Sequence, residues 1–196
     1  MREISLHILD IVQNSIDAGA SKILISVVAD RKEDKLTFCV EDNGKGMTPE
    51  LLAKVTDPFV TTRKTRRIGL GIPMLVAAAE QCNGKVDIRS EVGKGTTICA
   101  TFGLSHIDRA PFGDITSTLI SLIAANPAIY FRYEHCVDGK KFVLDTEEIN
   151  SKLEDVPISE PKVIDWLKDY INQSRPCRQN RLVKAYESCV CTSNST

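Results

Sequence analysis

Residues Glu41 to Leu52 read EDNGKGMTPELL, and they place a carboxylate and two glycines directly after an apolar run typical of a β-strand. Asp42, at the end of such a strand, can accept a hydrogen bond from an amino group, and the glycines at positions 44 and 46 allow close approach to the backbone. The same letters also describe an ordinary turn between two strands. The stretch by itself leaves open whether this turn binds a ligand.

The composition limits the classes of protein to consider. The chain has 196 residues, of which 42% are hydrophobic and 26% charged, and its formal net charge is −1. This length and composition predict a globular protein with one core and room for a smaller second one. The low net charge disfavours nucleic acid or an anionic membrane as the main partner. No signal-peptide pattern and no apolar run of about 18 residues is present in the sequence, so we expect a cytoplasmic protein.

Hydrophobic periodicity predicts an α+β sandwich for residues 1–104. Apolar residues recur at helical spacing from Ser5 to Ala18, and a second, polar stripe on this helix can face a ligand: His7, Asp10, Asn14 and Asp17. The other predicted elements are strands at 22–30 and 35–42, a short helix at 49–54, a longer helix that begins with glycines near 69–71, and a hairpin of 84–92 with 95–104. Helices alternating with strand pairs favour two packed layers.

Residues 105–173 predict a small αββαα module. Asp114 can cap a helix that ends at Asn126-Pro127, and Asp138-Gly139 between two apolar runs indicates a two-residue hairpin. Asp145 and Pro161 mark the starts of two further helices. The aromatic residues of the module are expected in its core: Tyr130, Phe131, Tyr133, Phe142 and Trp166. We expect the module to bind a protein partner, and residues 174–196 to form a flexible, cysteine-containing tail.

Three further patterns accompany the opening stretch in a fixed order. Asp10 and Asn14 are one helical turn apart, where an amide oxygen suits Mg²⁺ and a carboxylate can orient a nucleophile. RRIGLGIP at 66–73 brings glycines to a helix start, whose free amides favour phosphate, and GKGTT at 93–97 places a hydroxyl on the last hairpin. No Walker-type glycine loop occurs in the sequence. Together the four patterns indicate a nucleotide site.

With these patterns the chain resembles the GHKL ATPase family, which is shared by gyrase, the Hsp90 chaperone, sensor histidine kinases and the mismatch-repair protein MutL. DIVQNSIDAGA at 10–20 is similar to the family's N box, EDNGKGM at 41–47 to its adenine box, and DPFVTTRK at 57–64 to the lid of histidine kinases. GLG and GKGTT resemble its later glycine boxes. The resemblance covers about residues 5–104 and implies the Bergerat-type fold, a mixed sheet backed by helices with ATP between them.

The resemblance also implies roles for individual residues. Asn14 would bind Mg²⁺, Asp42 would bind the adenine amino group, and Asp10 would be the catalytic carboxylate. The other nucleotide-binding positions would be Asp17, Gly44, Gly46, Met47, Arg63 in the lid, Gly69, Leu70 and Gly71 at the phosphates, and Thr96 near the adenine. Two positions depart from the family: Asp10 stands where Glu is usual, and Arg67-Ile68 precede Gly69 where histidine kinases usually have Gly-Thr.

Two classes of function fit these features. The first is a stand-alone regulatory protein kinase that transfers phosphate from Mg-ATP to an unidentified protein partner in signal transduction. The second is a switch in which ATP changes a protein interaction without phosphotransfer, or a slow ATPase. The N box begins almost at Met1, which disfavours a MutL-type clamp and a complete histidine kinase. The sequence is compatible with a homodimer as well as with a monomer.

Histidine and cysteine residues have structural as well as functional interpretations. His7 is expected to be structural rather than a phosphoacceptor, because a helix that binds ATP cannot easily bring its own histidine to the γ-phosphate. Cys39, Cys82 and Cys99 lie in apolar patterns and are expected to be reduced, buried thiols.

The tail has three cysteines, Cys177, Cys189 and Cys191, which could bind a metal or cluster together with His135 or Cys136. Their spacing matches no zinc pattern, so unliganded thiols are the expectation.

Overall fold

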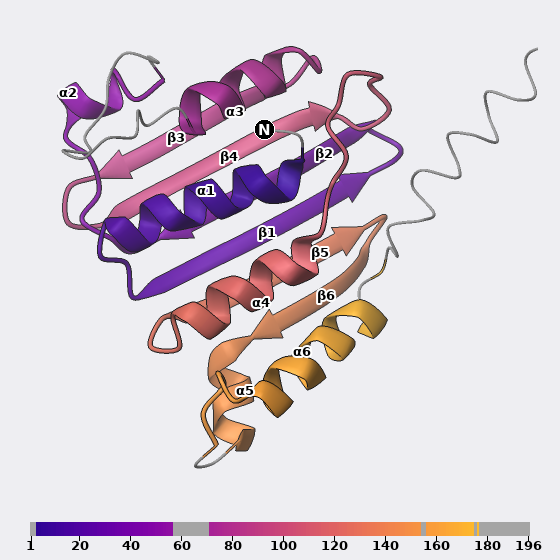
Figure 1. Ribbon diagram of the computed structural model, residues 1–196. Coiled ribbons are helices and arrows are strands. Elements are labelled where there is room, and N and C mark those ends of the chain that lie inside the picture. The colour runs from indigo at the N-terminus through magenta and orange to yellow at the C-terminus, as the bar shows by residue number, and fades with distance from the viewer. Residues whose placement is uncertain (1–2, 57–70, 154–155, 175, 177–196) are drawn as a thin grey trace, which may run out of the picture.

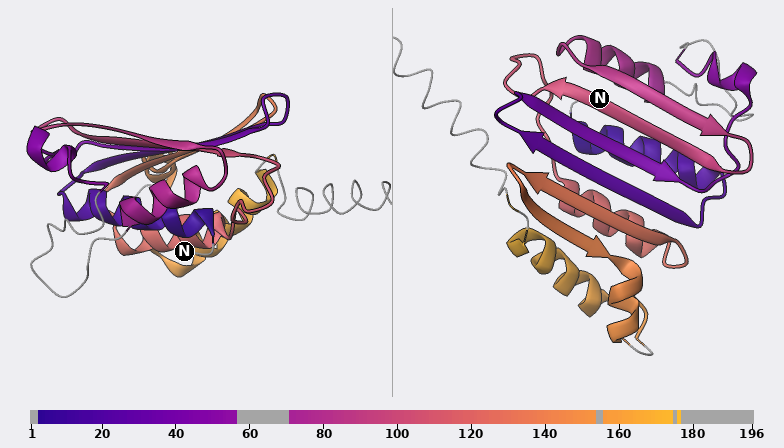
Figure 2. Two further views of the ribbon diagram at one scale, coloured as in Figure 1. Left: turned by 90° about the horizontal axis from the view of Figure 1, so that it is seen from above. Right: turned by 180° about the vertical axis from the view of Figure 1, so that it is seen from behind.

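The computed structural model describes residues 3–56, 71–153, 156–174 and 176. These residues form a six-stranded sheet in the order β3-β4-β2-β1-β5-β6. The β1–β5 neighbours are parallel and the other neighbours are antiparallel. Seen edge-on, the helices α1, α3, α4 and α6 lie on one face of the sheet, and the short α2 lies at the end of the strands (Figures 1 and 2). The predicted two-layer α+β fold with a mixed sheet is confirmed.

The strands alternate between buried and exposed residues because only one face of the sheet receives helices. They are β1 (Lys22–Asp30), β2 (Lys35–Asp42), β3 (Lys85–Glu91), β4 (Gly95–Gly103), β5 (Tyr130–Val137) and β6 (Lys140–Asp145). In β1, for example, Val27 is buried against the helices whereas Val28, on the other face, is 43% exposed. The second face therefore carries no helical layer in the described parts of the chain (Figure 2).

The helices of the described residues are α1 (Ile4–Asp17), α2 (Pro49–Leu52), α3 (Gly71–Glu80), α4 (Ile115–Ala125), α5 (Thr146–Leu153) and α6 (Pro161–Ser174). α1 packs a stripe of Ile4, Ile8 and Ile11 into the core, and Gly19, whose φ of 78° favours glycine, follows its C-cap. The first amides of α1 are bonded as well, since those of Ile4 and Ser5 donate to carbonyls of the segment before α4. Both ends of α1 are thereby fixed.

The residues after 104 form α4-β5-β6-α5-α6, in the order that the sequence predicts. Asp114 accepts from the Ser117 amide as the N-cap of α4, and Asp138 and Gly139 have the positive φ values of a tight hairpin turn. The strands of this module do not form a sheet of their own, because β5 pairs with β1 and extends the first sheet. A domain boundary near residue 104 stays a prediction.

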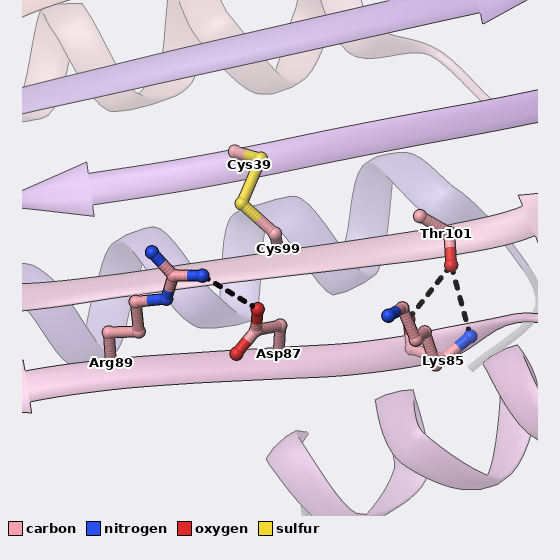
Figure 3. Close-up of a disulfide and its surroundings, with 6 residues drawn as sticks. All are labelled: Cys39, Lys85, Asp87, Arg89, Cys99 and Thr101. Carbon is pink, nitrogen blue, oxygen red and sulfur yellow. Dashed lines mark hydrogen bonds and ion pairs between the residues drawn. A yellow bond between two sulfur atoms is a disulfide. The ribbon is translucent and has the colours of Figure 1, made fainter.

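The expectation of reduced thiols is wrong for two cysteines. Cys39 on β2 and Cys99 on β4 are directly opposite each other and form a disulfide (Figure 3). Their Cα atoms are 4.1 Å apart, the close spacing of an opposed pair in an antiparallel ladder. They are half-buried on the face without helices, whereas Cys82 is a buried free thiol as expected.

The aromatic residues of the C-terminal half divide into two groups. Phe131, Tyr133 and Phe142 are buried, as predicted. Trp166 was predicted in the core but is 51% exposed, because the apolar stripe that α6 buries consists of Val163, Leu167 and Ile171. Tyr130 is half-buried and donates its hydroxyl to Asp145.

Across the described residues, no helix combines the length and the hydrophobicity that crossing a membrane requires.

Candidate functional site

Asp42, the last residue of β2, is the centre of the candidate site. Its side chain is buried at 9% exposure, yet it belongs to a strand end next to a turn. Its Oδ2 accepts a hydrogen bond from the Ser15 hydroxyl of α1 at 2.6 Å, and its Oδ1 accepts one from the Gly44 amide at 2.8 Å. A carboxylate has about four acceptor positions, so two stay available for donors of a ligand. Asp42 is therefore held in place and still able to bind.

The turn after Asp42 is fixed to the loop between α1 and β1. The Asn43 side chain accepts from the amides of Ser21 and Lys22 at 2.9 and 2.8 Å, and the Lys45 amide donates to the Ala18 carbonyl. Gly46 has a φ of 68°, and a Cβ there would overlap the Glu91 carbonyl oxygen. A glycine is thus required here by the protein itself, whatever the turn binds.

The β3–β4 hairpin contributes hydroxyl groups to the same region. Thr96 lies directly opposite Asp42 in the β2–β4 ladder, and its hydroxyl is 2.9 Å from that of Ser90. Ser90 also accepts from the Met47 amide at 2.8 Å and donates to the Gly95 carbonyl. These bonds join the glycine turn to the hairpin.

The polar stripe of α1 lies beside the start of α3. Asp10 and Asn14 are half-buried, and a Cβ on Gly71 would overlap the Asp10 carboxylate. Gly71 begins α3, so the Asp10 carboxylate lies at the positive end of that helix. Asp17 is exposed and accepts from Gln13 at 3.3 Å. α1 thus presents Asp10 toward the start of α3 and Ser15 toward Asp42, with Asn14 between them along the helix.

Most of the predicted site residues within the described ranges border this region. The contacts above involve Asp10, Asp42, Gly44, Gly46, Met47, Gly71 and Thr96, and Asn14 lies on α1 between Asp10 and Ser15. Arg63, Gly69 and Leu70 lie outside the described residues, as does the predicted lid.

Sequence reasoning missed Ser15 and Ser90. Each is a polar residue in line with apolar ones: Ser15 is buried and follows Ile8 and Ile11 on α1, and Ser90 is half-buried and follows the half-buried Val86 and Ile88 on β3. A hydroxyl at a core-facing position must find a partner, and this is the signal that would have drawn attention to both.

His7 is buried at 1% exposure, and neither ring nitrogen has a hydrogen-bond partner among the described residues. Burial disfavours the charged imidazole and, together with the positive N-terminus, lowers the pKa of His7 to about 4. This environment supports the structural interpretation of His7.

No cluster of three or more His, Cys, Asp or Glu side chains that could hold a metal occurs in the described ranges. The three tail cysteines lie outside them, so the predicted absence of a metal there stays a prediction.

A comparison with protein families bears on this geometry. The model of the family described as "Histidine kinase-, DNA gyrase B-, and HSP90-like ATPase" matches residues 2–106. The chain belongs to this family. The GHKL resemblance that the sequence patterns indicate is thereby confirmed over more than half of the chain.

Individual relatives include sensor kinases. The putative sensor histidine kinase NtrY-like of Rickettsia conorii is 32% identical over 108 residues, which are 55% of this chain and 18% of that protein. The sensor protein kinase FleS of Pseudomonas aeruginosa is 39% identical over 108 residues, 55% of this chain and 26% of that protein. This GHKL chain thus matches only a minor part of each relative's length.

Among solved structures, the crystal structure of the N-terminal domain of a DNA repair protein has a TM-score of 0.53 at 17% identity. The match covers 74% of this chain and 53% of that one. This structural match covers a larger share of the chain than the 55% that the sensor kinases match, and it supports the fold.

Proposed function

We propose that this GHKL chain binds Mg-ATP and acts as a regulatory protein kinase that transfers phosphate to a protein partner in signal transduction. The observation that carries the nucleotide part is the Asp42 carboxylate, which is buried, fixed by Ser15 and Gly44, and left with acceptor positions. Membership of the ATPase family supports ATP as the ligand. The sensor kinases among the relatives support phosphotransfer.

Adenine recognition follows from the chemistry of Asp42. Its carboxylate would accept a hydrogen bond from the adenine amino group, and the Thr96 hydroxyl, opposite Asp42 on β4, would bind the same base directly or through a water. Because Ser15 and Gly44 hold the carboxylate before ATP arrives, little side-chain entropy is lost on binding. We therefore expect selectivity for adenine.

The phosphate side of the site involves α1 and α3. Asn14 offers the neutral amide oxygen that suits Mg²⁺, which takes few protein ligands and completes its shell with phosphates and water. When bound, Mg²⁺ would neutralise charge on the phosphates during transfer. Asp10, one turn from Asn14 on α1, accepts or orients the proton of the attacking hydroxyl. The amide groups at the start of α3, beginning with Gly71, favour phosphate.

One observation favours the alternative, an ATP-dependent binding switch. The Asp10 carboxylate lies against Gly71, and Asp10 is one methylene shorter than the Glu that the family usually carries. A short carboxylate held beside the phosphate-facing end of α3 reaches an incoming nucleophile less easily. In this alternative ATP changes a protein interaction and turnover is slow or absent.

Calorimetric titration of Asp42→Ala with Mg-ATP tests the nucleotide part. The variant should bind about 5- to 150-fold more weakly, because it lacks the acceptor of the adenine amino group at a cost of about 1–3 kcal/mol. The matched control is Asp30→Ala. Asp30 also ends a strand, and its carboxylate accepts hydrogen bonds from two backbone amides of the following turn. Wild-type affinity in Asp42→Ala, or GTP binding as tightly as ATP, would contradict the proposal.

A further inference from the structure

We propose that Cys39 and Cys99 form a reversible thiol–disulfide site that regulates the candidate nucleotide site. The reagents would be small thiols and disulfides of the glutathione class. The covalent chemistry stands on the geometry of the two cysteines alone, whereas its regulatory effect rests on the proposed nucleotide binding.

The disulfide is accessible to such reagents. Both cysteines are half-buried on the face of the sheet that carries no helices in the described parts of the chain (Figures 2 and 3). Across the sheet, Cys99 is opposite Asp87 of β3, and Cys39 is opposite Ser26 of β1. These two directly opposite residues have short side chains, and both cysteines keep part of their surface exposed.

The charges around the disulfide do not repel an anionic reagent strongly. Asp87, the acidic neighbour of Cys99, is paired with Arg89 at 3.3 Å, and both side chains are exposed (Figure 3). The pair places a positive and a negative charge side by side, and their fields largely cancel at a distance in water. A glutathione-type thiolate can therefore reach either sulfur.

The same two strands carry the adenine side of the candidate site. The pair Cys39–Cys99 is three positions along the β2–β4 ladder from the pair Asp42–Thr96. The cross-link therefore opposes separation of β2 from β4 close to the residues that would contact the base. Without it, the strand ends can open locally at a lower free-energy cost.

The disulfide also encloses most of the candidate site in one covalent ring. The cysteines are 60 residues apart, and the chain between them includes Asp42, Gly46, Gly71 and Thr96. Closing a ring of this size removes much of the conformational freedom of the unfolded segment, an effect that grows with ring length. Oxidation should therefore stabilise every element in the ring, including α3 and β3.

The covalent step needs a thiol as reductant or a disulfide as oxidant. In reduction, an external thiolate attacks one sulfur, the Cys39–Cys99 bond breaks, and a mixed disulfide and one cysteine thiolate form. A second external thiolate attacks the mixed disulfide and releases the other cysteine, so two external thiols become one disulfide. Their two protons end on Cys39 and Cys99. Oxidation by glutathione disulfide is the reverse reaction.

The other cysteines in the described residues are not competing partners. Cys82, two residues after α3, is buried in the core on the helical side of the sheet. Cys136 lies on the same face as the disulfide but on β5, where it is opposite Val28 of β1, so β1 separates it from β2. Cys136 is free and half-buried and provides a matched control thiol.

The test compares oxidised and reduced full-length protein in glutathione buffers, with thiol state read by alkylation and mass spectrometry. The oxidised form should bind a non-hydrolysable Mg-ATP analogue about 3- to 10-fold more tightly, and reduction should lower the melting temperature by about 5–15 °C. By reciprocity, the analogue should make the disulfide harder to reduce by the same factor. The double variant Cys39→Ser/Cys99→Ser should match the reduced form in any buffer, and Cys136→Ser should keep the wild-type response.

Each of the other possible results of this experiment contradicts one specific part of the proposal. Equal affinity of the oxidised and reduced forms overturns the regulation while leaving the proposed function intact. Binding in neither form contradicts the proposed function itself, and the regulation falls with it. A Cys39–Cys99 pair that never forms in glutathione disulfide, or never opens in excess glutathione, overturns the redox site.

Discussion

Asp42 illustrates at the scale of one residue how much of a site a short pattern contains. Its position after a strand and before Gly-x-Gly is sufficient to suggest a ligand-binding carboxylate. Its partner Ser15 is 27 residues away and was not predicted, because no local pattern says which residue of α1 faces the end of β2. Residue types and spacings indicate which side chain binds the ligand. The hydrogen-bond partners that fix this side chain come from distant parts of the chain and are not visible in a local pattern.

The single-residue change Asp10→Asn separates the two proposed functions. We expect ATP affinity to change little, since Asp10 would act on the nucleophile, and phosphotransfer to a protein hydroxyl to slow by about 10²- to 10⁴-fold. Calorimetry and transfer of labelled γ-phosphate measure the two quantities. Asp42→Ala should show the opposite pattern, with the larger loss in affinity. Full transfer activity in Asp10→Asn refutes the general-base role, and wild-type protein without any turnover favours the binding switch.

At the scale of elements, helix α1 buries an unusual group. His7 lies one turn before Asp10 on α1, and its ring nitrogens are buried without partners among the described residues. A neutral imidazole here forgoes hydrogen bonds, and a charged one would be less favourable still. The packing of α1 should therefore be sensitive to acid.

Stability should fall as the pH drops from about 6.5 toward 4. The pKa of His7 is about 4 in the folded chain and near 6.5 when unfolded, so the unfolded chain binds the proton more tightly within this window. Above pH 6.5 the free energy of unfolding has its full value with respect to His7. It decreases as the pH falls and becomes constant again below pH 4, where the total loss is about 2 kcal/mol after allowance for solvent screening. Denaturant titrations at several pH values measure this.

The variant His7→Leu provides the comparison. It should be more stable than wild type at pH 7 by about 1 kcal/mol, because it removes unpaired polar atoms, and it should lose less stability on acidification. His106→Leu is the control, since His106 is half-buried and its Nδ1 already accepts from the Asp108 amide. An acid response in His7→Leu as large as in wild type would assign the effect to other groups.

At the scale of the whole molecule, the C-terminal half completes the sheet rather than lying beside it. β5 pairs with β1 along eight residues, from Lys22–Tyr130 to Ala29–Val137. Without β5 and α4, β1 would be an open edge and apolar surface of α1 would be uncovered. The family match ends at residue 106, so it does not include these elements.

A fragment of residues 1–106 should therefore be markedly less stable than the full chain. We expect a melting temperature lower by about 10 °C or more, or association through the edge of β1, measured by circular dichroism and size-exclusion chromatography. A chain that ends at Ser174 is the control and should keep both fold and ATP affinity, because the candidate site uses no residue beyond Thr96. A fragment 1–106 as stable as the full chain would instead establish an independent domain there.

The sequence by itself determined the elements, the family and most of the candidate site residues. Helix periodicity, the caps Asp114 and Asp145, and the Asp138-Gly139 turn act over a few residues and agree with the structure. Only the tertiary structure decided the β1–β5 pairing, the Ser15–Asp42 bond and the Cys39–Cys99 disulfide. Each joins residues far apart in the chain and depends on strand register or helix rotation. A slip of one residue would move every side chain of a strand to the other face, and no local pattern specifies which strand it will meet.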